Sequence, residues 1–228
     1  MNLPLKALIF DMDGVLIDSE HLWRKAMIKG FRTIGIDFTE DDCRKTTGMR
    51  FKEVVHIWLN HFKLEHVKVS EVEELVLHEL LHMINEEGKA IEGALDIHRF
   101  AKENGLKVGL ATSSYQLLVD AVLRKLKMEK AFDAIVSAEK MKYGKPHPEV
   151  FLKCAEALEV QPGECVVIED SINGVVAAKA ASMRVFTVPD LDHKFNKQFG
   201  VADWQCENMN DVLNILCTLE LHSTTKAQ

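Results

Sequence analysis

Four acidic residues stand directly after short hydrophobic runs, at positions Asp11, Asp13, Glu169 and Asp170. If these runs are neighbouring strands, the four carboxylates meet. Like charges about 4 Å apart repel by about 1 kcal/mol in water and by about 4 kcal/mol at an effective dielectric constant of about 20, so a cation is needed among them. An all-oxygen ligand set favours a hard ion, and Mg²⁺ is the usual one where the substrate carries phosphate. The pattern predicts a Mg²⁺ site formed by all four side chains.

Hydroxyl and ammonium groups beside this site could bind an anion. Thr112 and Ser113 follow the second hydrophobic run and precede a helical pattern, so they offer hydroxyls and the N–H groups of a helix N-terminus. Lys145 follows the third run and adds a positive charge. With a phosphoryl group held there, Asp11 could attack phosphorus in line and form an aspartyl phosphate. Asp13 could give a proton to the leaving oxygen and later take one from water.

The hydrophobic runs predict five buried parallel strands, which alternate with helical patterns. The strands are expected at residues 5–10, 107–111, 133–138, 165–168 and 184–188. The helices are expected at residues 94–105, 115–127, 148–160 and 171–182. This alternation indicates an α/β fold, a doubly wound Rossmann-like parallel sheet. Such sheets bind ligands at the carboxyl ends of their strands, where the residues described above lie.

A helical insert separates the first strand from the second. Roughly 90 residues lie between them, too many for an ordinary crossover, and residues 19–88 have helical patterns. We expect an α/β core of residues 1–18 and 89–222 and a helical cap domain of residues 19–88. Trp23 and Arg50 of this cap, with Ser114 of the core, are the candidate substrate contacts, and packing inside the cap is the alternative for Trp23.

The net charge, the first hydrophobic run and the cysteines limit the classes of partner and the cellular location that we expect. The chain has 28 Lys and Arg against 35 Asp and Glu, a net charge of −7, which gives no basic surface for nucleic acid. The first hydrophobic run is too short for a signal peptide or a membrane span. Five cysteines without a CxxC pair indicate reduced thiols. We expect a cytoplasmic monomer whose partner is a small-molecule phosphate monoester, with neither nucleic acid nor membrane as a partner.

Four segments resemble the signature motifs of the haloacid dehalogenase superfamily of phosphohydrolases. In chain order they are DMDGVLIDSE, ATSS, GKPHPEVF and IEDSINGV. The resemblance implies that Asp11 is the nucleophile and Asp13 the acid/base, and that Thr112 and Lys145 clamp the phosphate. It also implies a small four-helix cap.

The same resemblance implies a more detailed metal site. Glu169 and Asp170 would hold Mg²⁺ together with the side chain of Asp11 and the backbone carbonyl of Asp13. The superfamily is one of Mg²⁺-dependent phosphatases, so Mg²⁺ is the expected cofactor.

A finer resemblance is to the branch that hydrolyses hexose and hexitol phosphates, including 2-deoxyglucose 6-phosphate. It is carried by residues 18–23, 137–155 and 169–184. The neighbouring β-phosphoglucomutase branch has a histidine at the position of Trp23, whose indole offers only an N–H donor. We therefore expect water to be the phosphoryl acceptor, and a sugar phosphate mutase is the alternative.

Two further interpretations are weaker. A phosphoacceptor receiver module also gathers Asp, Thr and Lys on a doubly wound sheet, but it has no large helical insertion after the first strand. The segment from His78 to His82 fits the H-E-x-x-H pattern of zinc proteases. The residues after it supply no third histidine, which favours a coincidence.

Overall fold

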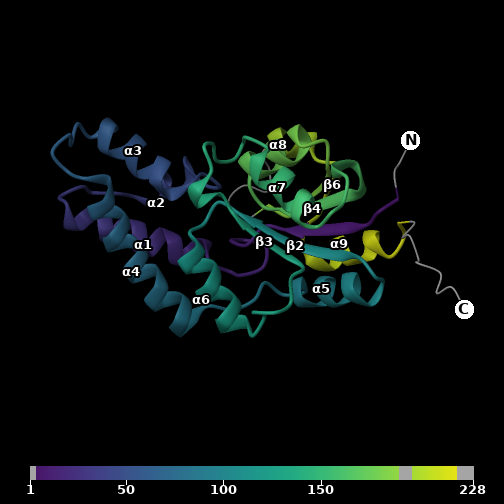
Figure 1. Cartoon of the computed structure of the whole chain (residues 1–228). Coiled ribbons are helices and arrows are strands. Elements are labelled where there is room, and N and C mark those ends of the chain that lie inside the picture. The colour runs from purple at the N-terminus through teal and green to yellow at the C-terminus, as the bar shows by residue number, and fades with distance from the viewer. Residues whose placement is uncertain (1–3, 190–196, 220–228) are drawn as a thin grey trace, which may run out of the picture.

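A six-stranded parallel sheet forms the centre of the structure, a computed structural model that describes residues 4–189 and 197–219 (Figure 1). The strands are β1 Ala7–Phe10, β2 Lys107–Thr112, β3 Ala134–Ser137, β4 Cys165–Glu169, β5 Arg184–Thr187 and β6 Trp204–Gln205. Their order is β3-β2-β1-β4-β5-β6, and every pair is parallel. The doubly wound α/β fold and its five expected strands are confirmed, and the two-residue strand β6 is an addition to the prediction.

Helices cover both faces of the sheet, which explains why its strands are hydrophobic on both sides. Leu8 and Phe10 of β1 belong to one hydrophobic cluster, whereas Ala7 and Ile9 belong to the other. The first cluster includes residues of α5 Ala94–Glu103, α6 Gln116–Leu126 and α9 Met209–Leu216. The second includes residues of α7 Glu149–Ala157 and α8 Ile172–Ala180, which lie above the sheet in Figure 1. Short 3₁₀ turns cover Ala138–Lys140, Pro162–Glu164 and Lys197–Val201.

Four helices occupy the segment between β1 and α5, to the left of the sheet in Figure 1. They are α1 Glu20–Thr33, α2 Glu40–Arg44, α3 Phe51–His61 and α4 Val69–Glu87. Gly30 of α1 faces Val76 of α4, where an added Cβ would lie 2.3 Å from Val76 Cγ2, so the glycine allows α1 to pack closely on α4. Phe38, between α1 and α2, stacks on Phe31 and meets the ring of Trp58 edge-on, which joins α3 to the same core.

The two connections between these helices and the sheet run beside each other. The backbone N–H of Asp18 donates to the carbonyl of Lys89 at 2.9 Å, and that of Ile91 donates to Leu16 at 3.1 Å. The boundaries expected between residues 18 and 19 and between 88 and 89 fall in these connections, and the division into core and cap stays a prediction. The expected end of the core at residue 222 lies outside the described residues. No helix in the described residues has the length and hydrophobicity needed to cross a membrane.

Candidate active site

Three of the expected acidic residues form a buried group at the carboxyl edge of the sheet. Asp11 follows β1, and Glu169 and Asp170 end and follow the neighbouring strand β4. Each offers a carboxylate oxygen, and these oxygens all lie within 4.8 Å of one another. The exposed fraction is 7% for Asp11, 0% for Glu169 and 5% for Asp170. The strand register thus brings together side chains that are about 160 residues apart in sequence.

Lys145 lies within this group and binds two of its members. Its Nζ donates to Asp11 Oδ1 at 2.7 Å, to Glu169 Oε1 at 2.6 Å and to the carbonyl of Ala111 at 3.3 Å. The other oxygen of Glu169, Oε2, accepts the backbone N–H of Asp170 at 3.0 Å and that of Ser171 at 3.1 Å. Buried charges need partners, and one ammonium cannot balance three carboxylates. Three ionised carboxylates would therefore leave the group with an excess of negative charge.

The pKa values of Asp11 and Asp170 show how strongly burial and neighbouring charge disfavour three ionised carboxylates. Burial raises the pKa of Asp11 to about 8, although the ammonium of Lys145 opposes the rise. Burial and the neighbouring Glu169 carboxylate hold the pKa of Asp170 well above its usual range. Further positive charge would keep these carboxylates ionised. A set of buried carboxylate oxygens fits Mg²⁺, which prefers hard oxygen ligands.

The carboxylate of Asp13 is held apart from this group. Its Oδ1 accepts Ser19 Oγ–H at 2.6 Å and the indole N–H of Trp23 at 2.9 Å, and its Oδ2 accepts Ser114 Oγ–H at 2.6 Å. This arrangement differs from the expectation that all four acidic side chains share one ion, because the Asp13 carboxylate binds Ser19, Trp23 and Ser114 instead. The chain turns sharply after β1, where the carbonyl of Met12 accepts the backbone N–H groups of Leu16 at 2.8 Å and Ile17 at 3.1 Å, and the Asp13 side chain binds different partners from Asp11.

Gly14 makes this turn possible. Its φ is +72°, in the left-handed region that favours glycine, and an added Cβ would lie 2.1 Å from Asp170 Oδ2. The absence of a side chain at this position lets Asp170 approach the turn after β1.

Two of the expected phosphate-binding residues lie at the end of β2, with Thr112 as its last residue and Ser113 at the start of the loop to α6. Thr112 is buried, and its Oγ1 accepts the backbone N–H of Ser114 at 3.0 Å. Ser113 Oγ donates to the carbonyl of Gly48 at 3.3 Å, which links this loop to the segment between α2 and α3. Thr112, Ser113 and Lys145 therefore lie at the edge of the sheet with Asp11, as the sequence predicts.

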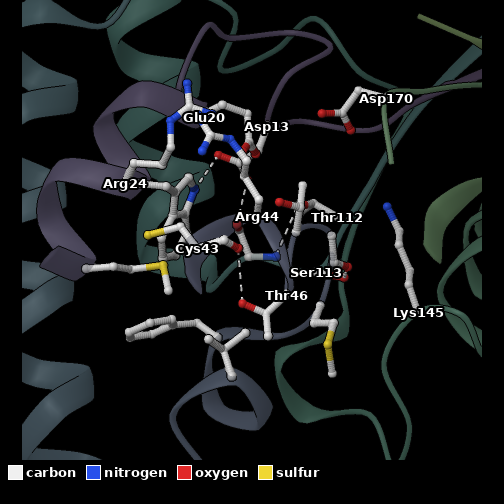
Figure 2. Close-up of a pocket in the computed structure, with 18 of the residues that line it drawn as sticks. Asp13, Glu20, Arg24, Cys43, Arg44, Thr46, Thr112, Ser113, Lys145 and Asp170 are labelled. Atoms are coloured by element: carbon white, nitrogen blue, oxygen red, sulfur yellow. Dashed lines mark hydrogen bonds between the residues drawn. The ribbon is translucent and has the colours of Figure 1, made fainter. Parts of the chain in front are cut away.

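A pocket opens between this edge and the helices α1 to α3 (Figure 2). Its core side includes Asp11, Asp13, Thr112, Ser113, Ser114, Lys145 and Asp170. Its other side includes Glu20, Trp23, Arg24, Cys43, Arg44 and Thr46. Figure 2 shows Lys145 and Asp170 on one side of the pocket and Arg24 and Cys43 on the other. The arrangement places charged and hydroxyl groups around one cavity.

Arg50 lies outside the lining of this pocket. Its Nη1 donates to the carbonyl of Met141 at 2.6 Å and to that of Ala138 at 3.4 Å, and the guanidinium also pairs with Glu53. The expected contact with substrate is thus replaced in this structure by a contact with the loop after β3. The side chain has this direction because Arg50 precedes the first turn of α3, which faces that loop.

Sequence reasoning missed two kinds of site residue. The sequence does not single out Ser19, because a serine directly before a helix commonly caps it, whereas this hydroxyl binds Asp13. Glu20 ends the first motif without a feature that marks it as a pocket residue, and Arg24 and Thr46 lie in none of the four motifs, because the position of all three depends on how the helices pack over the sheet.

The H-E-x-x-H segment lies in α4. Its Glu79 forms an ion pair with Lys29 of α1 at 2.6 Å. Within the described part of the chain, Asp11, Glu169 and Asp170 are the one group of at least three His, Cys, Asp or Glu side chains that could share an ion. His78 and His82 are not part of it.

The fold places this chain among the doubly wound α/β proteins that have a site at the carboxyl edge of the sheet. The chain belongs to the haloacid dehalogenase-like hydrolase family, which matches residues 5–182. It is therefore an enzyme of the hydrolase class.

Similar proteins include phosphatases. Hexitol phosphatase B from Escherichia coli is 37% identical over 207 residues, which cover 90% of this chain and 93% of that protein. A phosphorylated carbohydrates phosphatase from Thermotoga maritima is 38% identical over 191 residues, covering 81% of this chain and 85% of that protein.

Similar solved structures include a mutase. CbbY from Rhodobacter sphaeroides, in complex with phosphate, has a TM-score of 0.81 at 25% identity and covers 91% of this chain and 96% of its own. β-Phosphoglucomutase from Clostridium difficile has a TM-score of 0.82 at 26% identity, and the match covers 94% of this chain and 96% of that protein's chain. The chain is thus similar both to proteins named as phosphatases and to one named as a mutase.

Substitution of Gly14 by Ala tests the close packing of the turn on Asp170. We expect Gly14→Ala to lower the free energy of unfolding by about 2 to 4 kcal/mol, from overpacking and backbone strain together. Urea denaturation measures the loss. Gly35→Ala is the matched control, because Gly35 has a similar φ of +84° but no atom within 4 Å of an added Cβ. Equal losses in the two variants would contradict a specific contact with Asp170.

Proposed function

We propose that this enzyme is a Mg²⁺-dependent phosphatase that acts on a small sugar or polyol phosphate through an aspartyl phosphate on Asp11. The observation that carries the proposal is the buried group of Asp11, Glu169 and Asp170 around Lys145, at the base of a pocket. The phosphatases of hexitols and of phosphorylated carbohydrates among the similar proteins support this substrate class. Hexose 6-phosphates, 2-deoxyglucose 6-phosphate and hexitol phosphates are the candidate substrates.

Two carboxylates would carry the reaction. In the first step, a carboxylate oxygen of Asp11 forms a bond to phosphorus while the bond from phosphorus to the ester oxygen breaks. Asp13 gives a proton to that oxygen, and the alcohol leaves. In the second step, water attacks the phosphorus of the aspartyl phosphate and gives a proton to Asp13. The bond between Asp11 and phosphorus breaks, and inorganic phosphate leaves.

The other residues would hold the phosphoryl group and the metal. Thr112, Ser113 and Lys145 supply hydroxyl and ammonium donors for the phosphoryl oxygens. Asp11, Glu169 and Asp170 would hold Mg²⁺, with the backbone carbonyl of Asp13 as a further oxygen ligand. When bound, Mg²⁺ neutralises charge on the carboxylates and on the phosphoryl oxygens.

The helices over the pocket would select the alcohol part of the substrate. Glu20, Arg24 and Thr46 offer both donors and acceptors, which suit the hydroxyl groups of a sugar or polyol. The cap would also exclude water while the aspartyl phosphate forms. Contacts such as Asn173 Nδ2 to the carbonyl of Thr47, at 3.0 Å, hold it against the core.

Loss of the Asp11 nucleophile should stop turnover. We expect Asp11→Asn to reduce phosphate release by at least about 100-fold, because an amide cannot form the acyl phosphate. Phosphate release from 2-deoxyglucose 6-phosphate and from hexitol phosphates measures the effect, and circular dichroism shows whether the fold is retained. A folded Asp11→Asn variant with activity near that of the wild type would refute the role of Asp11.

Mg²⁺ should stabilise the protein through the acidic group. At 100 times its Kd, a bound ion stabilises the folded state by about 2.7 kcal/mol, which raises the Tm by roughly 5 to 10 °C for a chain of this size. Differential scanning fluorimetry with EDTA and with Mg²⁺ measures the shift. Asp170→Asn should remove most of it, whereas Asp96→Asn, at an exposed aspartate that pairs with Arg99, should retain it. No shift in the wild type would count against the metal site.

The similarity to β-phosphoglucomutase makes a mutase the second candidate function. Against it stands Trp23, whose indole lines the pocket and offers no acid or base. We expect β-glucose 1-phosphate to give glucose and phosphate in equal amounts, with no need for a bisphosphate primer. Glucose 6-phosphate that accumulates faster than free phosphate would favour the mutase, and coupled enzyme assays distinguish the two products.

A further inference from the structure

Both oxygens of the Asp13 carboxylate have hydrogen-bond donors. Trp23 Nε1 and Ser19 Oγ donate to Oδ1, at 2.9 and 2.6 Å, and Ser114 Oγ donates to Oδ2 at 2.6 Å. Asp13 and Trp23 both line the pocket. The three donors therefore fix the direction of a carboxyl group that lines the pocket.

The tryptophan differs from the two serines in its chemistry. A serine hydroxyl rotates and can either donate or accept, whereas an indole N–H only donates. The ring of Trp23 also packs against Phe51 of α3, with their centroids 5.4 Å apart, so its N–H has a fixed direction. Trp23 is thus the donor that most strictly requires Oδ1 to be an acceptor.

This requirement decides which oxygen of Asp13 can carry a proton. A proton on Oδ1 would point at the N–H of Trp23, which cannot accept it. A proton on Oδ2 meets only the hydroxyl of Ser114, which can turn to accommodate it. If Asp13 is the acid, these donors place the proton that it transfers on Oδ2.

The donors also come from different parts of the fold. Trp23 lies in the first turn of α1, and Ser114 lies between β2 and α6. The direction of the carboxyl group thus depends on α1 lying against the loop that follows β2. A displacement of α1 would release Asp13 from two of its three donors.

We propose that Trp23 is a positioning residue that holds the carboxyl group of Asp13 so that Oδ2 delivers the proton to the leaving oxygen of the substrate. The inference rests on the proposed function, in which Asp13 is the acid. As the bond from phosphorus to the ester oxygen breaks, its electron pair goes to that oxygen, which takes the proton from Oδ2. Asp11 forms the new bond to phosphorus in the same step.

Leaving groups of different basicity test this role. 2-Deoxyglucose 6-phosphate releases an alkoxide that must be protonated, whereas p-nitrophenyl phosphate releases a stable phenolate that needs no proton. Trp23→Phe keeps an aromatic ring against Phe51 but removes the N–H. We expect its kcat/KM, which reports the steps up to release of the alcohol and not the later attack of water, to fall by about 10- to 100-fold with 2-deoxyglucose 6-phosphate and by less than about 3-fold with p-nitrophenyl phosphate.

A matched control is available in the same part of the chain. Trp58 is a second tryptophan of these four helices, and its buried indole N–H has no hydrogen-bond partner within the described residues. Trp58→Phe makes the same change away from Asp13, so its kcat/KM with each substrate should stay close to that of the wild type. A selective loss with Trp58→Phe would overturn the inference.

Asp13→Asn separates this inference from the proposed function. If the kcat/KM of Asp13→Asn falls equally with both substrates, Asp13 is not the acid and the proposed function fails at that point. If Asp13→Asn is selective but Trp23→Phe affects both substrates equally or neither, the positioning role alone is overturned. Should Trp23→Phe not fold, benzothienylalanine at position 23 replaces the N–H by sulfur in a ring of the same shape, and the same selective loss is expected.

Discussion

The burial of three carboxylates around one ammonium is the interaction on which the rest of this structure depends. Lys145 is 2% exposed and binds both Asp11 and Glu169. Removing such charges from water is costly unless their partners are held in place. Two adjacent strands hold these partners in place, because Asp11 directly follows β1 and Glu169 ends β4. The backbone N–H groups at the start of the loop after β4 complete the hydrogen bonds of Glu169. The site is therefore as rigid as the sheet beneath it.

The position of β1 at the centre of the sheet determines where the remaining parts can attach. β2 and β4 flank it, so the loops after all three strands open at one edge. The four helices are inserted in the chain directly after β1, and both of their connections leave from this edge. Gly14 is needed because the chain must turn away from the sheet within a few residues while Asp170 lies against it. The positions of the acidic group and of the pocket above it therefore both depend on the central place of β1 in the sheet.

The sequence predicts the parts of this arrangement that depend on local patterns. Continuous hydrophobic runs identify five strands because a parallel strand is buried on both faces. β6 pairs with β5 through only Trp204 and Gln205, too few residues to make a pattern. The partners of Asp13 and Arg50 could not be predicted, because they lie on other elements and depend on how the helices dock on the sheet. The grouping of the four acidic side chains differs for the same reason: spacing along the chain does not define the turn after β1.

The two sides of the pocket have different physical tasks, and Trp23 belongs to both. In the proposed function, the charged core side would hold the phosphoryl group, whereas Glu20, Arg24 and Thr46 on the other side would contact the remainder of the substrate. Trp23 lines the pocket and also binds Asp13 on the core side. Loss of the ring at position 23 would change the shape of the pocket, whereas loss of the N–H alone, as in Trp23→Phe, would change the orientation of the proposed acid. Contacts with the substrate and proton transfer would therefore both depend on the position of α1.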